Sequence, residues 1–582
     1  MILSVWAPSA KSVELVTPAR RVALAADEKG YWRGEIEAAD VRGGYRYSID
    51  GGKPLPDPRS RWQAEGVHGA SHVLEGGRLE KSVGRFRPQP LYAAIIYELH
   101  IGTFTPAGTY AAARERLDHL VGLGITHVEL MPLATFPGRH GWGYDGVDLY
   151  APLPAYGTPD ELADFIAACH ERGLAVLLDV VYNHLGPDGN YLGAYGPYFT
   201  DRVKTPWGQA VNYDGAQSDE VRRFVIDNAI MWLGDYGFDG LRLDAVHAIF
   251  SFEAVHVLED LAAAVHELAI ESGRELVLIA ESDLNDPRLV LSAARGGFEL
   301  DAHWTDDFHH ALHRYFTGES EGYYADYAGL PDIATALTQG YVYQGQYSVF
   351  RQRRHGRAPR GVTPDRLVVC SQNHDQIGNR ARGERLSMLV ELPKLKAIAA
   401  LTLLSPFVPL LFQGEEWGAR TPFLYFTDHQ DAELGRLVSE GRAREFQSFR
   451  WGGEIPDPQA AATFERSKLD WAETAEPRHA ELLDWYRALI ALRKSRAERA
   501  PANAPAKPKV RFDAKAEWLR FEYAGVLAMF NFATVPRRID LPKGPWELAL
   551  DSQARAPGDA ASQTELPAQS TRIFRQYGLA RT

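Results

Sequence analysis

Apolar residues in the middle of the chain fall into short runs separated by longer amphipathic stretches. The stretches at 110–124 and 160–173 repeat apolar residues with the period of a helix. Runs that are apolar throughout and joined by helices are typical of parallel strands buried on both faces. Eight of them predict a (β/α)8 barrel over residues 89–500. The runs are AAIIYELH (93–100), ITHVELMP (125–132), AVLLDVVYNH (175–184), FDGLRLD (238–244), LVLIAE (276–281), FELDAHW (298–304), RLVVCSQNHD (366–375) and VPLLFQGEE (408–416).

The two ends of the chain have a different pattern. Residues 1–88 contain short alternating runs broken by Gly, Asp and Pro, which predict an N-terminal β-sandwich of the carbohydrate-binding kind. An Ala/Pro-rich linker precedes residues 508–582, which predict a C-terminal antiparallel β domain. Two connections inside the barrel are long, at about 183–220 and 304–364. Long loops after barrel strands usually shape an active site.

The composition argues against several classes of function. The formal net charge of −13 disfavours nucleic acid as a partner, because an acidic surface repels phosphates. The sequence has no apolar run of about eighteen residues that could span a membrane, and its start lacks the features of a signal peptide. The two cysteines, Cys169 and Cys370, lie in apolar contexts and are expected to be buried thiols in a reducing cytoplasm.

Polar side chains gather where the predicted barrel strands end. Since these ends meet at one mouth of a barrel, the side chains should converge there. Each has a simpler explanation alone: an Asp can cap a helix, a histidine can be structural, and Arg242 with Asp244 can be an ion pair. A purely structural explanation would require all of these to hold at once on four separate strands, which is an improbable coincidence. The residues are Asp179, Asn183 and His184 on the third strand, Arg242 and Asp244 on the fourth, Glu281 on the fifth, and His374 and Asp375 on the seventh.

The combination of residues narrows the chemistry. No HxxEH or HxH spacing stands out for a catalytic metal, and no Gly-rich loop is placed to hold a phosphate. Two closely spaced carboxyl groups suit glycoside cleavage, one as nucleophile and one as acid and then base. Retaining enzymes hold these groups about 5 Å apart, which neighbouring strand ends can provide.

Four segments resemble the four sequence regions of the α-amylase superfamily of retaining glycosidases, in the same order. They are LLDVVYNH (177–184), FDGLRLDAV (238–246), LIAES (278–282) and QNHD (372–375). The resemblance implies that Asp244 is the nucleophile, Glu281 the acid/base, and Asp375 the carboxylate that holds substrate hydroxyls. It implies substrate-site roles for Arg242, which should orient Asp244 and keep it ionised, and for His184, His374, Tyr144, Asp145, His247 and Trp207.

Two of these residues, His247 and Trp207, are expected on the side of the active site that binds the leaving group. Superfamily members often carry a Lys-His pair after the nucleophile, but here DAVHAI has His247 and no lysine. The leaving-group site is therefore expected to differ. Trp207, in the excursion after the third strand, is the expected platform for the leaving sugar, and the alternative is a loop anchor.

Longer segments resemble the malto-oligosyltrehalose trehalohydrolase family, including YELHIGTFTPAGTY (97–110) and NHDQIGNRARGERL (373–386). The resemblance implies hydrolysis of the α-1,4 bond next to a terminal trehalose, with a maltooligosyltrehalose synthase as functional partner. A monomeric chain is expected. The alternatives are a glycogen branching or debranching enzyme, or a glycan-binding pseudo-enzyme. No cofactor or metal is expected, and Asn183 is expected to hold loop backbone rather than Ca²⁺.

Overall fold

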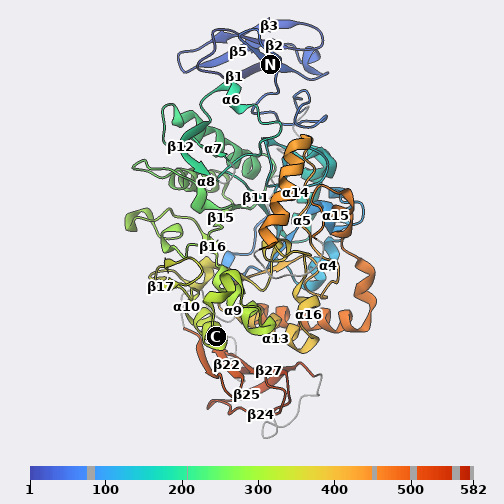
Figure 1. Ribbon diagram of the computed structural model, residues 1–582, viewed down its shortest axis with the longest axis vertical. Coiled ribbons are helices and arrows are strands. Elements are labelled where there is room, and N and C mark those ends of the chain that lie inside the picture. Colours follow the sequence, from blue (N-terminus) through green and yellow to red (C-terminus); the bar gives the residue numbers. More distant parts are fainter. Residues whose placement is uncertain (75–85, 206–207, 448–454, 498–506, 554–563, 577–582) are drawn as a thin grey trace.

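Eight parallel strands close into a barrel at the centre of the molecule (Figure 1). The computed structural model describes residues 1–74, 86–205, 208–447, 455–497, 507–553 and 564–576. The strands follow one another around the barrel in chain order, each hydrogen-bonded to the next. They are β7 (Ile96–Leu99), β8 (His127–Leu130), β11 (Ala175–Val180), β14 (Gly240–Leu243), β15 (Val277–Ala280), β16 (Ala302–Trp304), β19 (Leu367–Cys370) and β20 (Val408–Phe412). The predicted (β/α)8 barrel is confirmed.

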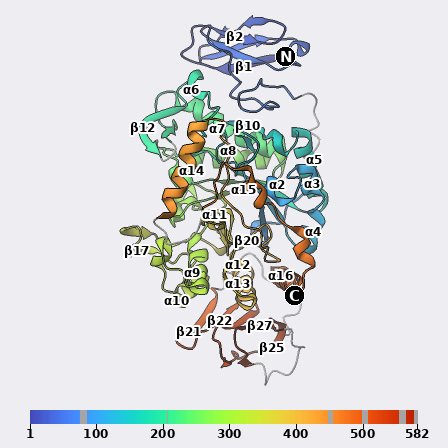
Figure 2. The ribbon, with the colours of Figure 1, turned by 45° about the vertical axis from the view of Figure 1, so that its right-hand side comes forward.

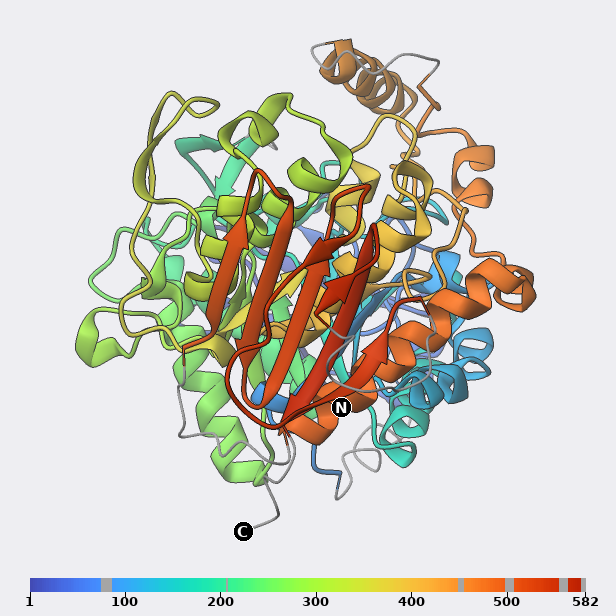
Figure 3. The same ribbon diagram turned by 90° about the horizontal axis from the view of Figure 1, so that it is seen from below.

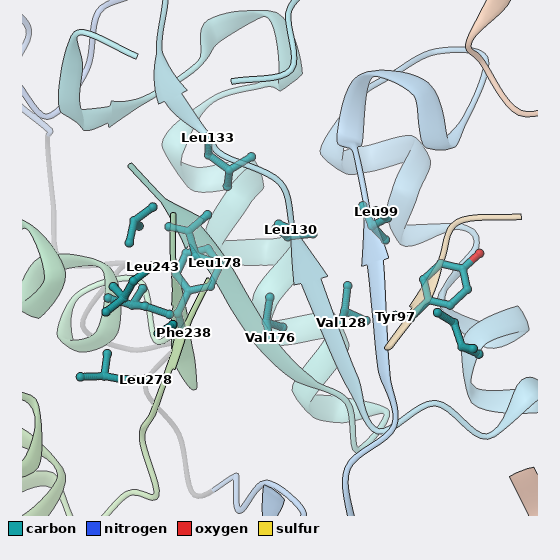
Figure 4. Close-up of a cluster of buried hydrophobic side chains, with 14 of the residues drawn as sticks. Tyr97, Leu99, Val128, Leu130, Leu133, Val176, Leu178, Phe238, Leu243 and Leu278 are labelled. Carbon is teal, nitrogen blue, oxygen red and sulfur yellow. The ribbon is translucent and has the colours of Figure 1, made fainter. Parts of the chain in front are cut away.

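The strands are apolar on both faces because each face is covered. Val128 and Leu130 on β8, and Val176 and Leu178 on β11, pack in the layer between barrel and helices (Figure 4). Leu177, between the last two in sequence, belongs instead to the cluster that fills the barrel interior. Successive side chains of a strand point to opposite faces, so both layers need apolar residues.

Helices surround the barrel and join its strands. Helix α5 starts with a capping box, in which Thr158 and Glu161 bind each other's backbone N–H groups. Within the described residues, no helix combines the length and apolar character needed to cross a membrane. The main helices are α4 (Leu117–Leu123), α5 (Pro159–Glu171), α7 (Ser218–Gly234), α8 (Val257–Ser272), α9 (Asp306–Thr317), α10 (Leu330–Gln339), α13 (Leu392–Leu404), α14 (Ala432–Gln447) and α16 (Pro477–Ala497).

An N-terminal β domain lies at one end of the molecule (Figures 1 and 2). The rings of Trp6 and Tyr198 meet edge to face at 5.3 Å between centroids. Arg59 pairs with Asp227 at 2.8 Å and joins this domain to α7. The domain has two three-stranded antiparallel sheets, β1 (Ile2–Trp6), β5 (Tyr31–Glu35) and β4 (Ala25–Ala26), and β3 (Arg21–Ala23), β2 (Val13–Val16) and β6 (Arg46–Ile49).

A C-terminal β domain lies at the opposite end, and its five-stranded sheet extends across the barrel in the view of Figure 3. Phe532 packs on Tyr315 of α9 with ring centroids 5.2 Å apart. Lys396 of α13 donates to the backbone oxygen of Ser552 at 2.7 Å. The sheet contains β21 (Lys509–Asp513), β22 (Trp518–Tyr523), β23 (Val526–Asn531), β27 (Ser570–Gln576) and β25 (Trp546–Asp551).

Both long connections carry structure of their own. The first contains α6 (Leu192–Tyr195) and the hairpin of β12 (Phe199–Thr205) and β13 (Gly208–Val211). The second contains α9, α10 and the hairpin of β17 (Gln344–Ser348) and β18 (Arg353–Gly356). Cys169 and Cys370 are buried and unpaired, as expected for thiols in apolar surroundings.

Candidate active site

Arg242 lies at the centre of the barrel mouth and joins three carboxylates. Asp179 on β11 stands directly opposite it in the strand register, and the two side chains pair at 2.8 Å. Arg242 Nη1 also contacts Asp244 Oδ1 at 2.7 Å, and its Nη2 lies 3.8 Å from Glu281 Oε2. Burial alone would lower the pKa of Arg242, but these carboxylates raise it well above the ordinary value. The guanidinium is therefore a fixed positive charge.

Asp244 is held from two sides. Arg242 binds its Oδ1, while Asn183 donates through Nδ2 to Oδ2 at 2.7 Å and to the backbone oxygen of Asp244 at 2.8 Å. The other amide atom of Asn183, Oδ1, meets Nδ1 of His184. With both amide atoms engaged, Asn183 is a positioning group for Asp244. Among the described residues, no group of three or more His, Cys, Asp or Glu side chains is arranged to hold a metal ion.

Glu281 ends β15 and faces the same guanidinium. Its Oε2 accepts a hydrogen bond of 2.6 Å from the backbone N–H of Ala245. Ala245 has φ 38° and ψ 51°, an unfavourable left-handed conformation for a residue with a Cβ. In this turn the backbone N–H of Ala245 points at Oε2 of Glu281. The other carboxylate oxygen of Glu281, Oε1, is then the one that can carry a proton. Burial raises the pKa of Glu281 to about 6, with Arg242 opposing the shift and Asp244 reinforcing it.

Asp375 completes the set of three candidate carboxylates and is the most open of them. Its side chain is 41 % exposed, compared with 12 % for Asp244 and 15 % for Glu281. It lies in the first turn of α11 (His374–Gly378), which Asn373 caps by accepting a 2.9 Å hydrogen bond from the backbone of Gln376. The cap explains why an amide precedes this carboxylate at the end of a buried strand.

His374 and Tyr144 link the first and seventh strands to Asp179 and Arg242. Glu98 on β7 pairs with Nδ1 of His374, and Nε2 of His374 lies 2.7 Å from the hydroxyl of Tyr144. That hydroxyl donates to Asp179 Oδ2 at 2.6 Å, and Asp179 holds Arg242. Burial would lower the pKa of His374, but Glu98 and Asp375 outweigh it and raise the pKa to about 9. His374 is therefore positively charged at neutral pH and donates toward Tyr144.

A cavity of about 670 Å³ opens above these groups. One wall comes from the segment after β20, including α14, which is orange in Figures 1 and 2. Arg442 of α14 donates to the backbone oxygen of Gly378 and stacks over Tyr425 at 4.9 Å, so α14 is attached to the C-terminal end of α11, the helix that carries Asp375. The lining residues are Trp142, Tyr144, Asp145, His184, Asp244, Ala245, His247, Glu281, Asp375, Asn379, Tyr425, Phe426, Thr427, Val438, Gly441 and Arg442.

Seven of the ten residues to which the sequence assigned a catalytic or substrate-site role line this cavity. Two more, Arg242 and His374, lie beneath it and contact lining residues. Asp145 lies 3.8 Å from Nε2 of His429, in the segment after β20. Trp207 lies outside the described residues.

Sequence reasoning missed Glu98 and the α14 wall. Glu98 has the same strand parity as the inward-facing Ile96, and this spacing could have placed it in the barrel interior. Asp179 was recognised from the sequence as a strand-end residue. Its pairing with Arg242 was not predictable, because it depends on the register between β11 and β14. No sequence signal places α14 over the mouth, because its position depends on contacts with residues far away in the chain.

The chain is similar to known proteins over nearly its full length. The family model "Alpha amylase, catalytic domain" matches residues 89–196. A malto-oligosyltrehalose trehalohydrolase of Rhizobium sp. (strain M-11) is 47 % identical, covering 98 % of this chain and 97 % of the relative. The corresponding protein of Arthrobacter ramosus is 50 % identical over 86 % of this chain and 88 % of its own.

A solved structure supports the same relationship. A Salmonella typhimurium protein, provisionally described as an alpha amylase, superposes with a TM-score of 0.90 at 36 % identity. The match covers 99 % of this chain and 97 % of that one. On these similarities, the chain belongs to the malto-oligosyltrehalose trehalohydrolase family.

Proposed function

We propose that this enzyme hydrolyses the α-1,4-glucosidic bond next to the terminal trehalose of maltooligosyltrehalose, releasing trehalose with retention of configuration. The observation that carries the proposal is the contact of Asp244 and Glu281 with one guanidinium group, that of Arg242. Two carboxylates beside one guanidinium can stand at the separation of about 5 Å that double displacement uses. The relatives' names supply the identity of the leaving unit.

Asp244 is the nucleophile in this proposal. Arg242 and Asn183 each hold one of its carboxylate oxygens, which fixes the carboxylate for attack on the anomeric carbon. Glu281 donates its proton to the glycosidic oxygen as the bond to trehalose breaks. It then removes a proton from the water that hydrolyses the glycosyl-enzyme. A pKa of about 6 allows Glu281 to take both roles near neutral pH.

The remaining residues bind the sugars. Asp375 accepts hydrogen bonds from hydroxyls of the sugar whose bond is cleaved, and its exposure to the cavity suits this role. The ring of Tyr144 lines the cavity and supports that sugar, with His184 and Asp145 beside it. His374 acts from beneath through its contact with Tyr144. His247 faces the leaving unit, and Trp207 keeps its proposed role as a platform there.

The substrate must come from a reaction that converts the reducing end of a maltooligosaccharide into a 1,1-linked glucose pair. We assign that step to a maltooligosyltrehalose synthase as functional partner. The two buried, unpaired thiols fit a reducing compartment, and we place the enzyme in the cytoplasm as a monomer.

Two substrates of equal length test the proposal. Maltotriosyltrehalose and maltopentaose both contain five glucose units, but only the first ends in trehalose. We expect the kcat/KM for maltotriosyltrehalose to be at least 10-fold higher, since polar sites discriminate strongly against ligands that leave their groups unpaired. Equal rates would indicate a general α-glucan hydrolase. New branch points would indicate a branching enzyme, and binding without turnover a glycan-binding protein.

A further inference from the structure

The start of α14 is held by a carboxylate from the first long connection, after β11. Oδ2 of Asp188 accepts hydrogen bonds from the backbone N–H groups of Gln430 at 3.0 Å and of Asp431 at 3.2 Å. Asp431 in turn caps α14, because its Oδ1 accepts from the backbone of Glu433 at 2.9 Å and of Leu434 at 3.0 Å. The side chain of Asp188 is 9 % exposed, and hydrogen bonds to a carboxylate are stronger than those between neutral groups. A single side chain therefore fixes where α14 begins.

The loop that carries Asp188 rests on the N-terminal β domain. Gly189 has φ 79°, and a Cβ at this position would collide with the buried Val67, so only a residue without a side chain fits there. His68 contacts the loop twice, with Nδ1 2.7 Å from the hydroxyl of Tyr191 and Nε2 3.4 Å from Oδ1 of Asp188. The carboxylate thus contacts the N-terminal domain through one oxygen and the start of α14 through the other.

The same loop and α14 both contact the residues around the cleaved sugar. A Cβ on Gly186 would collide with the backbone oxygen of Asp145, which lines the cavity. Asp145 also lies 3.8 Å from Nε2 of His429, just before α14. Further along, α14 lines the cavity itself, and its Arg442 binds the C-terminal end of α11, the helix that carries Asp375. The wall formed by α14 is therefore attached at both ends.

We infer that Asp188 is a positioning residue for the maltooligosaccharide chain of the substrate: it fixes α14 against the N-terminal domain, and α14 binds the glucose units beyond the cleaved sugar. The inference rests on the proposed function, in which Asp145 and Asp375 hold the cleaved sugar. Trehalose departs past Glu281, which protonates the leaving oxygen, so the other glucose units extend from the opposite side of the cleaved sugar. A wall attached to Asp145 and to α11 can meet them there. Because Asp188 holds this wall in place beforehand, less freedom is lost when the chain binds.

Two substrates with the same leaving unit separate this role from a general loss of structure. Maltotriosyltrehalose and glucosyltrehalose both end in trehalose, but only the first has glucose units beyond the cleaved sugar. For Asp188→Ala we expect the KM for maltotriosyltrehalose to rise about 5- to 50-fold, as for lost hydrogen bonds to a charged group, with kcat within about twofold. The kcat/KM for glucosyltrehalose should stay within about twofold. The variant should therefore lose preference for the longer substrate.

Three further variants make the result specific. Asp188→Asn keeps one oxygen that can accept from the two backbone N–H groups, so it should recover most of the preference. Asp201→Ala removes an exposed carboxylate from β12 in the same connection and should change neither rate. His68→Ala should cause a smaller loss of the same kind, and this loss tests the inference even if Asp188→Ala does not fold. Added to Asp188→Ala, it should have little further effect, because the contact between the two residues is already lost.

Several outcomes would overturn the inference. They are equal losses on both substrates in Asp188→Ala, an unchanged preference in that variant, and an unmodified enzyme that does not prefer the longer substrate. A loss in the double variant equal to the product of the two single losses would overturn the link to the N-terminal domain. If the unmodified enzyme released no trehalose from either substrate, the proposed function itself would fail.

Discussion

Glu98 binds His374 twice, through the backbone N–H at 3.0 Å and through the imidazole Nδ1. The two residues come from the first and seventh barrel strands, and both side chains are 1 % exposed. A buried carboxylate that accepts from an imidazole keeps the imidazole protonated and fixes its orientation. His374 can then direct Nε2 at Tyr144, whose hydroxyl leads through Asp179 to Arg242.

Replacing Glu98 with Gln should lower the pKa of His374 from about 9 and disturb this chain. The raised pKa stabilises the fold fully below pH 6.5, the ordinary value, and that stability is lost as the pH rises through about 9. The contribution is about 3 kcal/mol. The unfolding temperature of the unmodified enzyme should therefore fall between pH 6.5 and pH 9 more than that of Glu98→Gln. Differential scanning calorimetry across this range measures the difference.

Glu65→Gln is the matched control, because Glu65 pairs with His72 at 3.0 Å on the surface. It should leave the pH dependence of unfolding unchanged. An identical pH dependence for Glu98→Gln and the unmodified enzyme would show that His374 does not carry the proton we assign to it.

Substitutions of Glu281 and Asp244 test the chemical roles assigned to these two carboxyl groups. Glu281→Gln should reduce kcat/KM on maltotriosyltrehalose by about 10² to 10⁴, because the leaving oxygen loses its proton donor. The same variant should keep most of its kcat/KM on α-maltotriosyl fluoride, since fluoride departs without a proton from the enzyme. Asp244→Asn should fail on both substrates, because the nucleophile is lost. Equal losses for the two substrates in Glu281→Gln would contradict the assignment of the acid.

The pH dependence follows from the same carboxyl group. Glu281 must be protonated to act as acid and has a pKa raised to about 6, so kcat/KM of the unmodified enzyme should decline as the pH rises through about 6. Glu281→Gln, assayed on the fluoride, should lack this decline. A decline at the same pH in the variant would mean that another group is titrating.

The sequence was informative where the pattern is local. Eight apolar runs predicted the barrel strands, and polar residues at the strand ends predicted the residues around the cavity. The two-residue spacing of Arg242 and Asp244 predicted side chains on one side of a strand, and they are in contact. Contacts that join distant segments were not predictable. The pairing of Arg351 with Asp283 depends on a hairpin 68 residues further along the chain, and no local pattern encodes it.

Glu129 is the counterpart of Glu98 on the neighbouring strand, and among the described residues neither of its carboxylate oxygens has a hydrogen-bond partner. Burial raises its pKa well above the ordinary 4.5, with Glu98 reinforcing the shift. A carboxyl with a raised pKa destabilises the fold increasingly as the pH rises above its unfolded value. Glu129→Gln should thus be more stable than the unmodified enzyme, by a margin that grows with pH at up to about 1.4 kcal/mol per unit.

Chemical denaturation at several pH values measures that margin. Glu253→Gln, at an exposed position, serves as the control and should show no such trend. A stability difference for Glu129→Gln that is the same at pH 4 and pH 8 would show that Glu129 does not stay protonated in the fold.

The most direct measurement is a proton NMR time course of maltotriosyltrehalose hydrolysis by the unmodified enzyme. It identifies both products and the anomer that forms first. The account predicts trehalose and maltotriose in equal amounts, with the α-anomer of maltotriose appearing before mutarotation produces the β-anomer, since double displacement retains configuration. Initial formation of the β-anomer, or release of glucose or maltose in place of trehalose, would contradict it.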